Sequence, residues 1–117
     1  MTEMAIDSRT RAVLTAVKSA LLERYGSRLA GLYLFGSRAR GDHREDSDLD
    51  LAVVLHDPRQ PLTLADRELL DVTYPVEIEK GMAIQAWTLP AAALAGDRPD
   101  PFCGRLAETI RAEGKLV

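Results

Sequence analysis

Two short motifs in the first half of the chain combine the residue types that phosphate and divalent metal require. Gly36-Ser37 directly follows the apolar run at residues 32–35, and Asp48-x-Asp50 begins the next apolar run. Glycine lets the backbone turn tightly and approach a ligand, while serine adds a hydroxyl group beside the free N–H groups of a helix start. We therefore expect Gly36 and Ser37 to contact the phosphates of a small ligand.

The two aspartates are spaced for metal binding. Asp48 and Asp50 begin a predicted strand, so their side chains project on the same side, roughly 7 Å apart at the backbone. At that separation two carboxylates repel each other by about 2 kcal/mol at an effective dielectric constant of about 20. Magnesium, which prefers carboxylate and phosphate oxygens, removes this repulsion, and two such ions about 4 Å apart can assist a displacement at phosphorus. We expect Asp48 and Asp50 to be metal ligands and catalytic residues.

The elements that would position these motifs follow from apolar spacing and turn residues. Residues 7–25 have helical periodicity, with Asp7 or Ser8 able to cap the helix and Gly26 placed to end it. Apolar runs predict strands at residues 32–35, 48–55 and 82–89. One helical turn should follow Gly36, and the polar residues 42–47 should form a loop.

The second half of the chain predicts three more helices. One begins at Thr63, with Asp66 completing a variant capping box. Its apolar positions are Leu64, Leu69, Leu70 and Val72. Pro75 should kink or end this helix, and residues 76–79 form either a last helical turn, which we favour, or a short strand. A short helix at 90–95, a proline-rich turn at 97–101 and a closing helix at 101–113, ended by Gly114, should follow.

Length and composition favour a single α/β domain over residues 1–117, with a small mixed sheet flanked by helices. Apolar residues make up 46% and charged residues 28% of the chain, which is enough to bury a core. The net charge of −3 argues against direct nucleic-acid binding, because affinity for nucleic acid depends on a basic face. Cys103 is the only cysteine, so we expect a reducing, cytoplasmic location, and we predict no signal peptide or membrane span.

The stretch LFGSRARGDHREDSDLDLAVVL is similar to the signature of the minimal nucleotidyltransferases, a small branch of the DNA polymerase β-like superfamily. In that signature Gly-Ser is followed after ten residues by Asp-x-Asp, and here the ten residues are 38–47. The fuller motif is also present, as Gly36, Ser37, Ala39, Arg40, Gly41, Ser47, Asp48, Asp50 and Leu51. The final segment, PFCGRLAETIRAEGKLV, is similar to the last helix of the family.

This resemblance implies a polymerase β-like fold with magnesium on Asp48 and Asp50. It also implies a nucleoside triphosphate, usually ATP, whose β- and γ-phosphates contact Gly36 and Ser37. Arg38 and Arg40 are either solvated or in contact with phosphate or a partner, and we include them in the candidate nucleotide site. Family members are often antitoxins whose partner is a HEPN-domain ribonuclease, and some silence that partner by attaching AMP to a tyrosine.

The chain departs from the family pattern at the third carboxylate, which usually comes from a later strand. Residues 82–89 contain neither Asp nor Glu, and if Ile84 faces the core, Gln85 faces the site. A neutral amide neither attracts magnesium strongly nor serves as a base. Glu77 and Glu79 could substitute only if their segment pairs as a strand. Binding of metal and nucleotide is therefore better supported than turnover.

Three functions stay open at this point. The leading one is a nucleotidyltransferase-fold antitoxin that binds Mg-ATP and transfers AMP to, or masks, a HEPN-type toxin. Gln85 favours a second, a catalytically weakened module that neutralises its partner by occlusion. The third is an enzyme acting on a small hydroxylated substrate. Trp87 adds a further ambiguity, because it could stack on a nucleobase or pack against the closing helix, and we favour packing.

Overall fold

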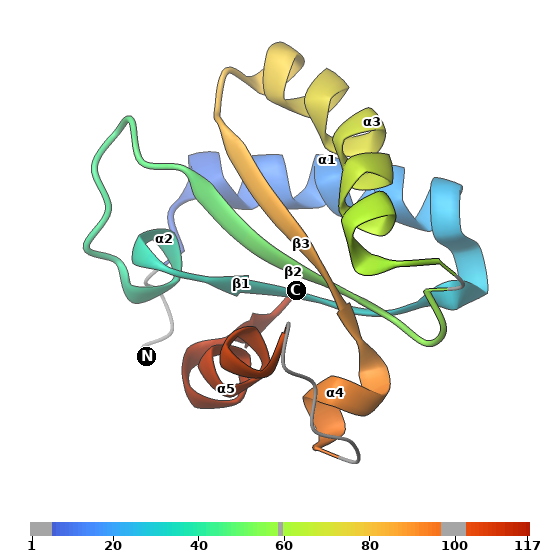
Figure 1. The fold of residues 1–117 in the computed structure, drawn as a ribbon. Coiled ribbons are helices and arrows are strands. Elements are labelled where there is room, and N and C mark those ends of the chain that lie inside the picture. Colours follow the sequence, from blue (N-terminus) through green and yellow to red (C-terminus); the bar gives the residue numbers. More distant parts are fainter. Residues whose placement is uncertain (1–5, 59, 97–102) are drawn as a thin grey trace.

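The computed structural model describes residues 6–58, 60–96 and 103–117, and it places a four-stranded mixed sheet between two layers of helices (Figure 1). The helices are α1 (Ser8–Tyr25), η1 (Gly26–Arg28), α2 (Ser37–Arg40), α3 (Leu62–Lys80), α4 (Ala91–Ala95) and α5 (Gly104–Glu113). The strands are β1 (Leu29–Phe35), β2 (Leu49–Leu55), β3 (Ile84–Pro90) and β4 (Lys115–Leu116). The predicted fold class, a small mixed sheet flanked by helices, is confirmed.

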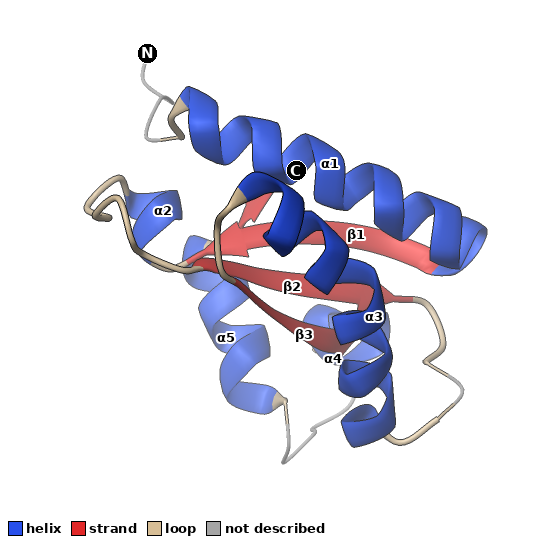
Figure 2. Ribbon diagram, turned by 90° about the horizontal axis from the view of Figure 1, so that it is seen from above, coloured by secondary structure: helices blue, strands red, loops and turns tan. Residues whose placement is uncertain are grey.

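The sheet has the order β3-β2-β1-β4, which places the two motif-bearing strands at its centre. β1 is antiparallel to both β2 and β4, whereas β2 and β3 are parallel. A parallel pair needs a long crossover, and α3 provides it. In Figures 1 and 2, α1 and α3 cover one face of the sheet, and α4 and α5 cover the other.

Two apolar clusters fill the spaces on either side of the sheet, and β2 contributes to both. Leu49, Leu51 and Val53 belong to the cluster shared with α1 and α3. Ala52 and Val54 belong to the cluster shared with α4 and α5. The alternation of strand side chains explains this division. It also turns Asp50 toward the α4 and α5 side of the sheet, as an even-numbered position of β2.

The predicted first helix is confirmed. Asp7 caps α1 by accepting a hydrogen bond from the Thr10 backbone N–H at 2.7 Å, and Gly26, with φ of 55°, follows its last residue. The predicted strands are also found, although β1 begins three residues earlier than expected, at Leu29. The short strand β4 was not predicted, because two residues are too few to show a periodicity.

The capping box predicted for the third helix is wrong. α3 begins at Leu62 after Pro61, and no side chain caps it. Asp66 instead accepts a hydrogen bond from the Thr88 backbone N–H at 2.7 Å, across to β3. The helix continues through Pro75 to Lys80, so residues 76–79 are helical, as favoured. Pro75 is exposed, and water can therefore satisfy the carbonyl group that loses its helical partner.

Only two of the four apolar residues that the sequence assigned to the inner side of α3 are buried. Leu69 and Val72 are buried, but Leu64 and Leu70 are 49% and 59% exposed on the outer side of the helix. The proline-rich turn expected at 97–101 lies outside the described residues, and so does the start of the closing helix, which is described from Gly104 onward. None of the described helices is long and apolar enough to cross a membrane.

Candidate functional site

Gly36 forms the turn between β1 and α2 and lies directly against Asp50. Its backbone has φ of 78° and ψ of −160°, a conformation that favours glycine. A Cβ atom at this position would collide with Oδ2 of Asp50. Ser37 is the first residue of α2, so its backbone N–H has no partner within the helix. The turn therefore brings backbone donors and a carboxylate together at one end of the sheet.

Asp48 and Asp50 lie at the start of β2, next to this turn. Asp48 is exposed and immediately precedes the strand, while Asp50 is partly buried and pairs in register with Phe35 of β1. Burial raises the pKa of Asp50, the charge of Asp48 raises it further, and Arg40 opposes the shift. A partly desolvated carboxylate beside a second one is the arrangement in which a divalent cation most favours the charged form.

On β3, the residue that pairs with Asp50 is Gln85. The two residues pair in register between the parallel strands β2 and β3. Register partners project on the same face, so the amide of Gln85 lies beside the Asp50 carboxylate. Gln85 is exposed, whereas Ile84 before it is buried. The predicted orientation of this strand is thus what the structure shows.

Neither Glu77 nor Glu79, both in α3, takes the place of a third carboxylate from a strand. Glu77 belongs to the helix, and its Oε1 accepts a hydrogen bond from the Ile84 backbone N–H at 2.9 Å. Glu79 is exposed on the same helix. In the described ranges, no cluster of three or more His, Cys, Asp or Glu side chains could hold a metal ion.

Arg38 is buried, with 1% of its surface exposed, although the sequence suggested solvent or phosphate around it. Its guanidinium donates to the carbonyl oxygens of Arg44, Glu45 and Ser47 at 3.0–3.3 Å and to Oγ1 of Thr10 at 2.9 Å. These bonds tie the loop between α2 and β2 to α1. Arg38 therefore has a structural role here, and a contact with phosphate stays a prediction.

Glu113, at the end of α5, is a residue that the sequence analysis did not select. Its Oε1 lies 3.4 Å from the backbone nitrogen of Gly36 and 3.2 Å from Nη1 of Arg40. Arg40 also contacts Asp42. The Glu113 carboxylate thus accepts hydrogen bonds from Gly36 and Arg40, the donors that we expect to contact phosphate. The sequence holds no signal for it, because 77 residues separate Glu113 from Gly36.

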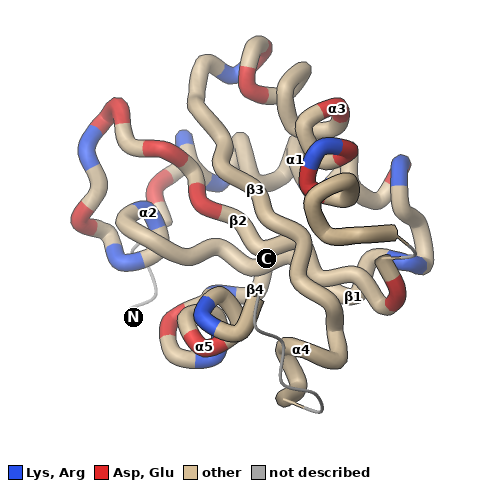
Figure 3. The backbone as a smooth tube through the Cα atoms, in the orientation of Figure 1, with Lys and Arg blue, Asp and Glu red and all other residues tan. Residues whose placement is uncertain are grey.

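Charge is unevenly distributed around this site (Figure 3). Acidic and basic residues gather along the loop between α2 and β2, whereas β3 and α4 contain none. Asp48 and Asp50 supply two hard oxygen ligands, and their mutual repulsion favours a cation between them. The residues present therefore fit magnesium in part, because the chain offers two carboxylates and the remaining ligands would have to come from elsewhere.

Comparison with known proteins identifies the family of this chain. The family described as the nucleotidyltransferase domain matches residues 14–90, which extend from α1 through β3. This chain belongs to that family. A solved chain described as a putative minimal nucleotidyltransferase is 32% identical and has a TM-score of 0.56, with 92% of this chain and 91% of that chain covered.

Two further comparisons are more limited. Protein adenylyltransferase MntA of Thermococcus cleftensis is 51% identical over 41 residues, which are 35% of this chain and 39% of that protein. The chain thus aligns with little more than a third of the length of the curated relatives it matches. A toxin-antitoxin crystal structure with AMP-PNP is 22% identical, with a TM-score of 0.59 over 86% of this chain and 68% of that one. At this identity the similarity concerns the fold alone.

Proposed function

We propose that this protein binds Mg-ATP at the turn between β1 and α2 and transfers AMP to a hydroxyl group of a partner protein. The observation that carries the proposal is the direct contact between Gly36 and the carboxylate of Asp50. This contact supports the proposal, because a triphosphate held at the Gly36 turn could share a metal ion with the Asp50 carboxylate. Gly36, Ser37 and Arg40 are proposed as nucleotide ligands, and Asp48 and Asp50 as metal ligands and catalytic residues.

The chemistry follows from these roles. The acceptor oxygen forms a bond to the α-phosphorus, the bond from that phosphorus to pyrophosphate breaks, and the acceptor proton passes to a base or to solvent. Magnesium, when bound, would neutralise charge on the phosphates. Ser37 and Arg40 would hold the departing pyrophosphate, and the chain's own share of catalysis is positioning and charge stabilisation. Gln85 cannot take the acceptor proton.

The proposed partner is a toxin protein of the HEPN type, and the proposed location is the cytoplasm. Support for a partner comes from the names of the relatives: one is a protein adenylyltransferase and another is a toxin-antitoxin complex. In this proposal the described residues bind the nucleotide and do not bind the acceptor. An acceptor hydroxyl supplied by another protein would complete it.

A second function is favoured by the identity of residue 85. If Gln85 leaves the site without its base, the protein could neutralise the toxin by covering it, with nucleotide binding serving only to stabilise the complex. The two functions differ in one observable, which is the covalent attachment of AMP.

The test uses the full chain with a candidate HEPN-type toxin and ATP labelled at either the α- or the γ-phosphate. The proposal predicts that α-label, but not γ-label, becomes attached to the toxin and that magnesium is required. A toxin that is inhibited without gaining α-label would favour occlusion. Gain of γ-label would contradict the proposed reaction, because it would show transfer of a phosphoryl group.

A further inference from the structure

The outer side of α3 presents a row of large apolar side chains to solvent. Leu64, Leu70, Tyr74 and Ile78 are between 49% and 65% exposed, and all four belong to this one helix. Single exposed apolar residues are ordinary on a protein surface, whereas several of them on one helix face mark an interaction surface. The outer face of α3 is therefore a candidate for association with another protein surface.

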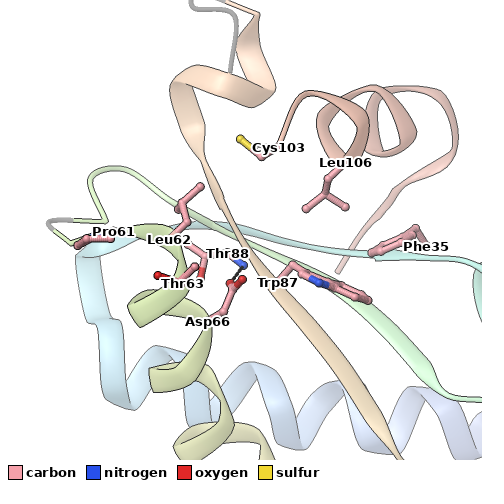
Figure 4. A pocket seen from close by; sticks show the side chains of 9 residues that line it. All are labelled: Phe35, Pro61, Leu62, Thr63, Asp66, Trp87, Thr88, Cys103 and Leu106. Carbon is pink, nitrogen blue, oxygen red and sulfur yellow. Dashed lines mark hydrogen bonds between the residues drawn. The ribbon is translucent and has the colours of Figure 1, made fainter. Parts of the chain in front are cut away.

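The other sides of α3 are held by contacts within the chain. Figure 4 shows Asp66 at the wall of a hollow beside β3, where it accepts a hydrogen bond from the Thr88 backbone N–H at 2.7 Å. On the side of α1, Glu68 accepts a hydrogen bond from Arg24 at 2.7 Å. These contacts fix the rotation of α3 about its own axis, so the same residues always face outward.

The outward residues of α3 have a spacing that is typical of paired helices. Leu64, Arg67, Asp71, Tyr74 and Ile78 are separated by three, four, three and four residues, and all five are exposed. An average period of about 3.5 residues places them in one row along the helix, which is the row that faces the partner helix in a coiled coil. This row has apolar residues toward its ends and one charge of each sign between them.

The row is complementary to itself when two copies of α3 run antiparallel. Residues 64 and 74 are equally far from position 69, so Leu64 lies opposite Tyr74 of the second copy. Residues 67 and 71 are also equally far from position 69, so Arg67 lies opposite Asp71 of the second copy. In a parallel pair each charge would instead meet its own copy and be repelled. Neither Arg67 nor Asp71 forms an ion pair with another described residue, so both charges can pair with a second copy.

We infer that two copies of this chain associate through the outer face of α3, with the helices antiparallel and the two-fold axis crossing them near Leu69. Leu70, on the flank of the row, lies beside its own copy close to this axis. A second copy fits this face because one surface supplies both members of each pair. Asp50 faces the α4 and α5 side of the sheet, whereas α3 covers the opposite side (Figure 2). The association therefore leaves both candidate sites open and does not depend on the proposed function.

Sedimentation equilibrium of the full chain, without nucleotide or metal, measures this association. The wild type should form a reversible dimer whose affinity falls as the salt concentration rises, because exposed charges are screened. Arg67→Asp gathers four carboxylates around the axis and should weaken dimerisation by about tenfold or more. Asp71→Arg gathers four guanidinium groups there and should have a similar effect.

An equimolar mixture of these two variants gives the sharpest comparison. In the mixed dimer, each Asp of one chain lies opposite an Arg of the other chain at both pairs. The mixture should therefore dimerise with an affinity within about threefold of the wild type. A folding defect in either variant could not produce this recovery. Arg105→Asp, the same change of charge at an exposed position of α5, is the matched control and should leave dimerisation unchanged.

Three results would overturn the inference. The first is a wild type that stays monomeric up to about 1 mM. The second is that the two single variants dimerise as well as the wild type, or that their mixture does not recover affinity. The third is a monomeric wild type that binds a candidate HEPN-type toxin more tightly than Arg67→Asp does, because α3 would then dock the toxin and not a second copy.

Discussion

Asp50 of β2 and Gln85 of β3 are register partners in the parallel strand pair, so a carboxylate and a neutral amide lie side by side at the candidate site. Burial and the charge of Asp48 already raise the pKa of Asp50. A third carboxylate at position 85 would strengthen this effect in the absence of metal and would favour a second cation. Because Gln85 is neutral, the metal-free site has less charge repulsion than a site with three carboxylates would have. Gln85 also cannot act as a base.

Gln85→Asp should increase the rate of AMP transfer to the toxin. A carboxylate at this position can accept the proton of the acceptor hydroxyl, a contribution of about a hundredfold in comparable enzymes. The measurement is the initial rate of α-label incorporation at saturating Mg-ATP. Gln85→Asn, which keeps a shorter neutral amide, is the matched control and should give no increase. A wild-type rate equal to that of Gln85→Asp, together with loss of activity in Glu77→Gln or Glu79→Gln, would contradict this account.

Glu113→Gln should raise the affinity for Mg-ATP. The Glu113 carboxylate lies at the Gly36 N–H and at Arg40, so an incoming phosphate must displace a negative charge. The pair with Arg40 is largely exposed, which limits the gain to about 1 kcal/mol, or roughly fivefold in affinity. Titration calorimetry compares it with Glu108→Gln, an exposed glutamate of the same helix. An unchanged or reduced affinity in Glu113→Gln alone would show that Glu113 does not compete with phosphate.

Arg38→Lys should lower the stability of the protein more than it lowers nucleotide affinity. A lysine cannot satisfy the three carbonyl groups and the Thr10 hydroxyl that the guanidinium bonds. We expect a loss of about 3 kcal/mol in the free energy of unfolding, or roughly 10 °C in Tm. Arg44→Ala, at an exposed position of the same loop, should have little effect. A stable Arg38→Lys variant that no longer binds ATP would instead indicate a phosphate contact.

Asp7→Asn should remove a part of the stability that depends on pH. The Thr10 backbone N–H is the main cause that lowers the pKa of Asp7 to about 2, and a contact with His43 adds to it. A lowered pKa stabilises the folded state above the unfolded pKa, and that stabilisation is lost as the pH falls from about 4 to about 2. Asparagine still caps the helix, so the difference at neutral pH should stay below about 1 kcal/mol.

Urea midpoints measured for wild type and Asp7→Asn between pH 7 and pH 2.5 provide the readout. The two curves should differ at neutral pH and converge toward the acid end. Curves that stay parallel throughout would show that the charge of Asp7 does not contribute to stability.

Much of the fold could be predicted because it depends on local patterns. Helical periodicity and the Asp7 cap predict α1, and the apolar run after the polar loop predicts β2. The favoured continuation of α3 past Pro75 is also correct. Alternation along β3 correctly turns Gln85 toward Asp50, since a period of two is fixed once Ile84 is buried.

The side chains whose roles the sequence did not predict, those of Asp66, Arg38 and Glu113, make contacts with distant segments. Asp66 matches a capping pattern, but its carboxylate instead accepts a hydrogen bond from the backbone N–H of Thr88, which lies 22 residues further along the chain on β3. Arg38 is buried only because the loop folds back over it and presents carbonyl groups. Glu113 reaches Gly36 only because α5 packs against β1. Local propensity holds no information about such pairs, so their roles had to come from the three-dimensional structure.

Magnesium-dependent binding of ATP by wild type and by the double variant Asp48→Asn, Asp50→Asn tests the central claim most directly. The wild type should bind ATP only in the presence of magnesium, and the double variant should show no binding under either condition. Its Tm without metal should be unchanged or higher, because two like charges that repel each other are removed. Equal ATP affinity with and without magnesium, or equal affinity of wild type and double variant, would contradict the account.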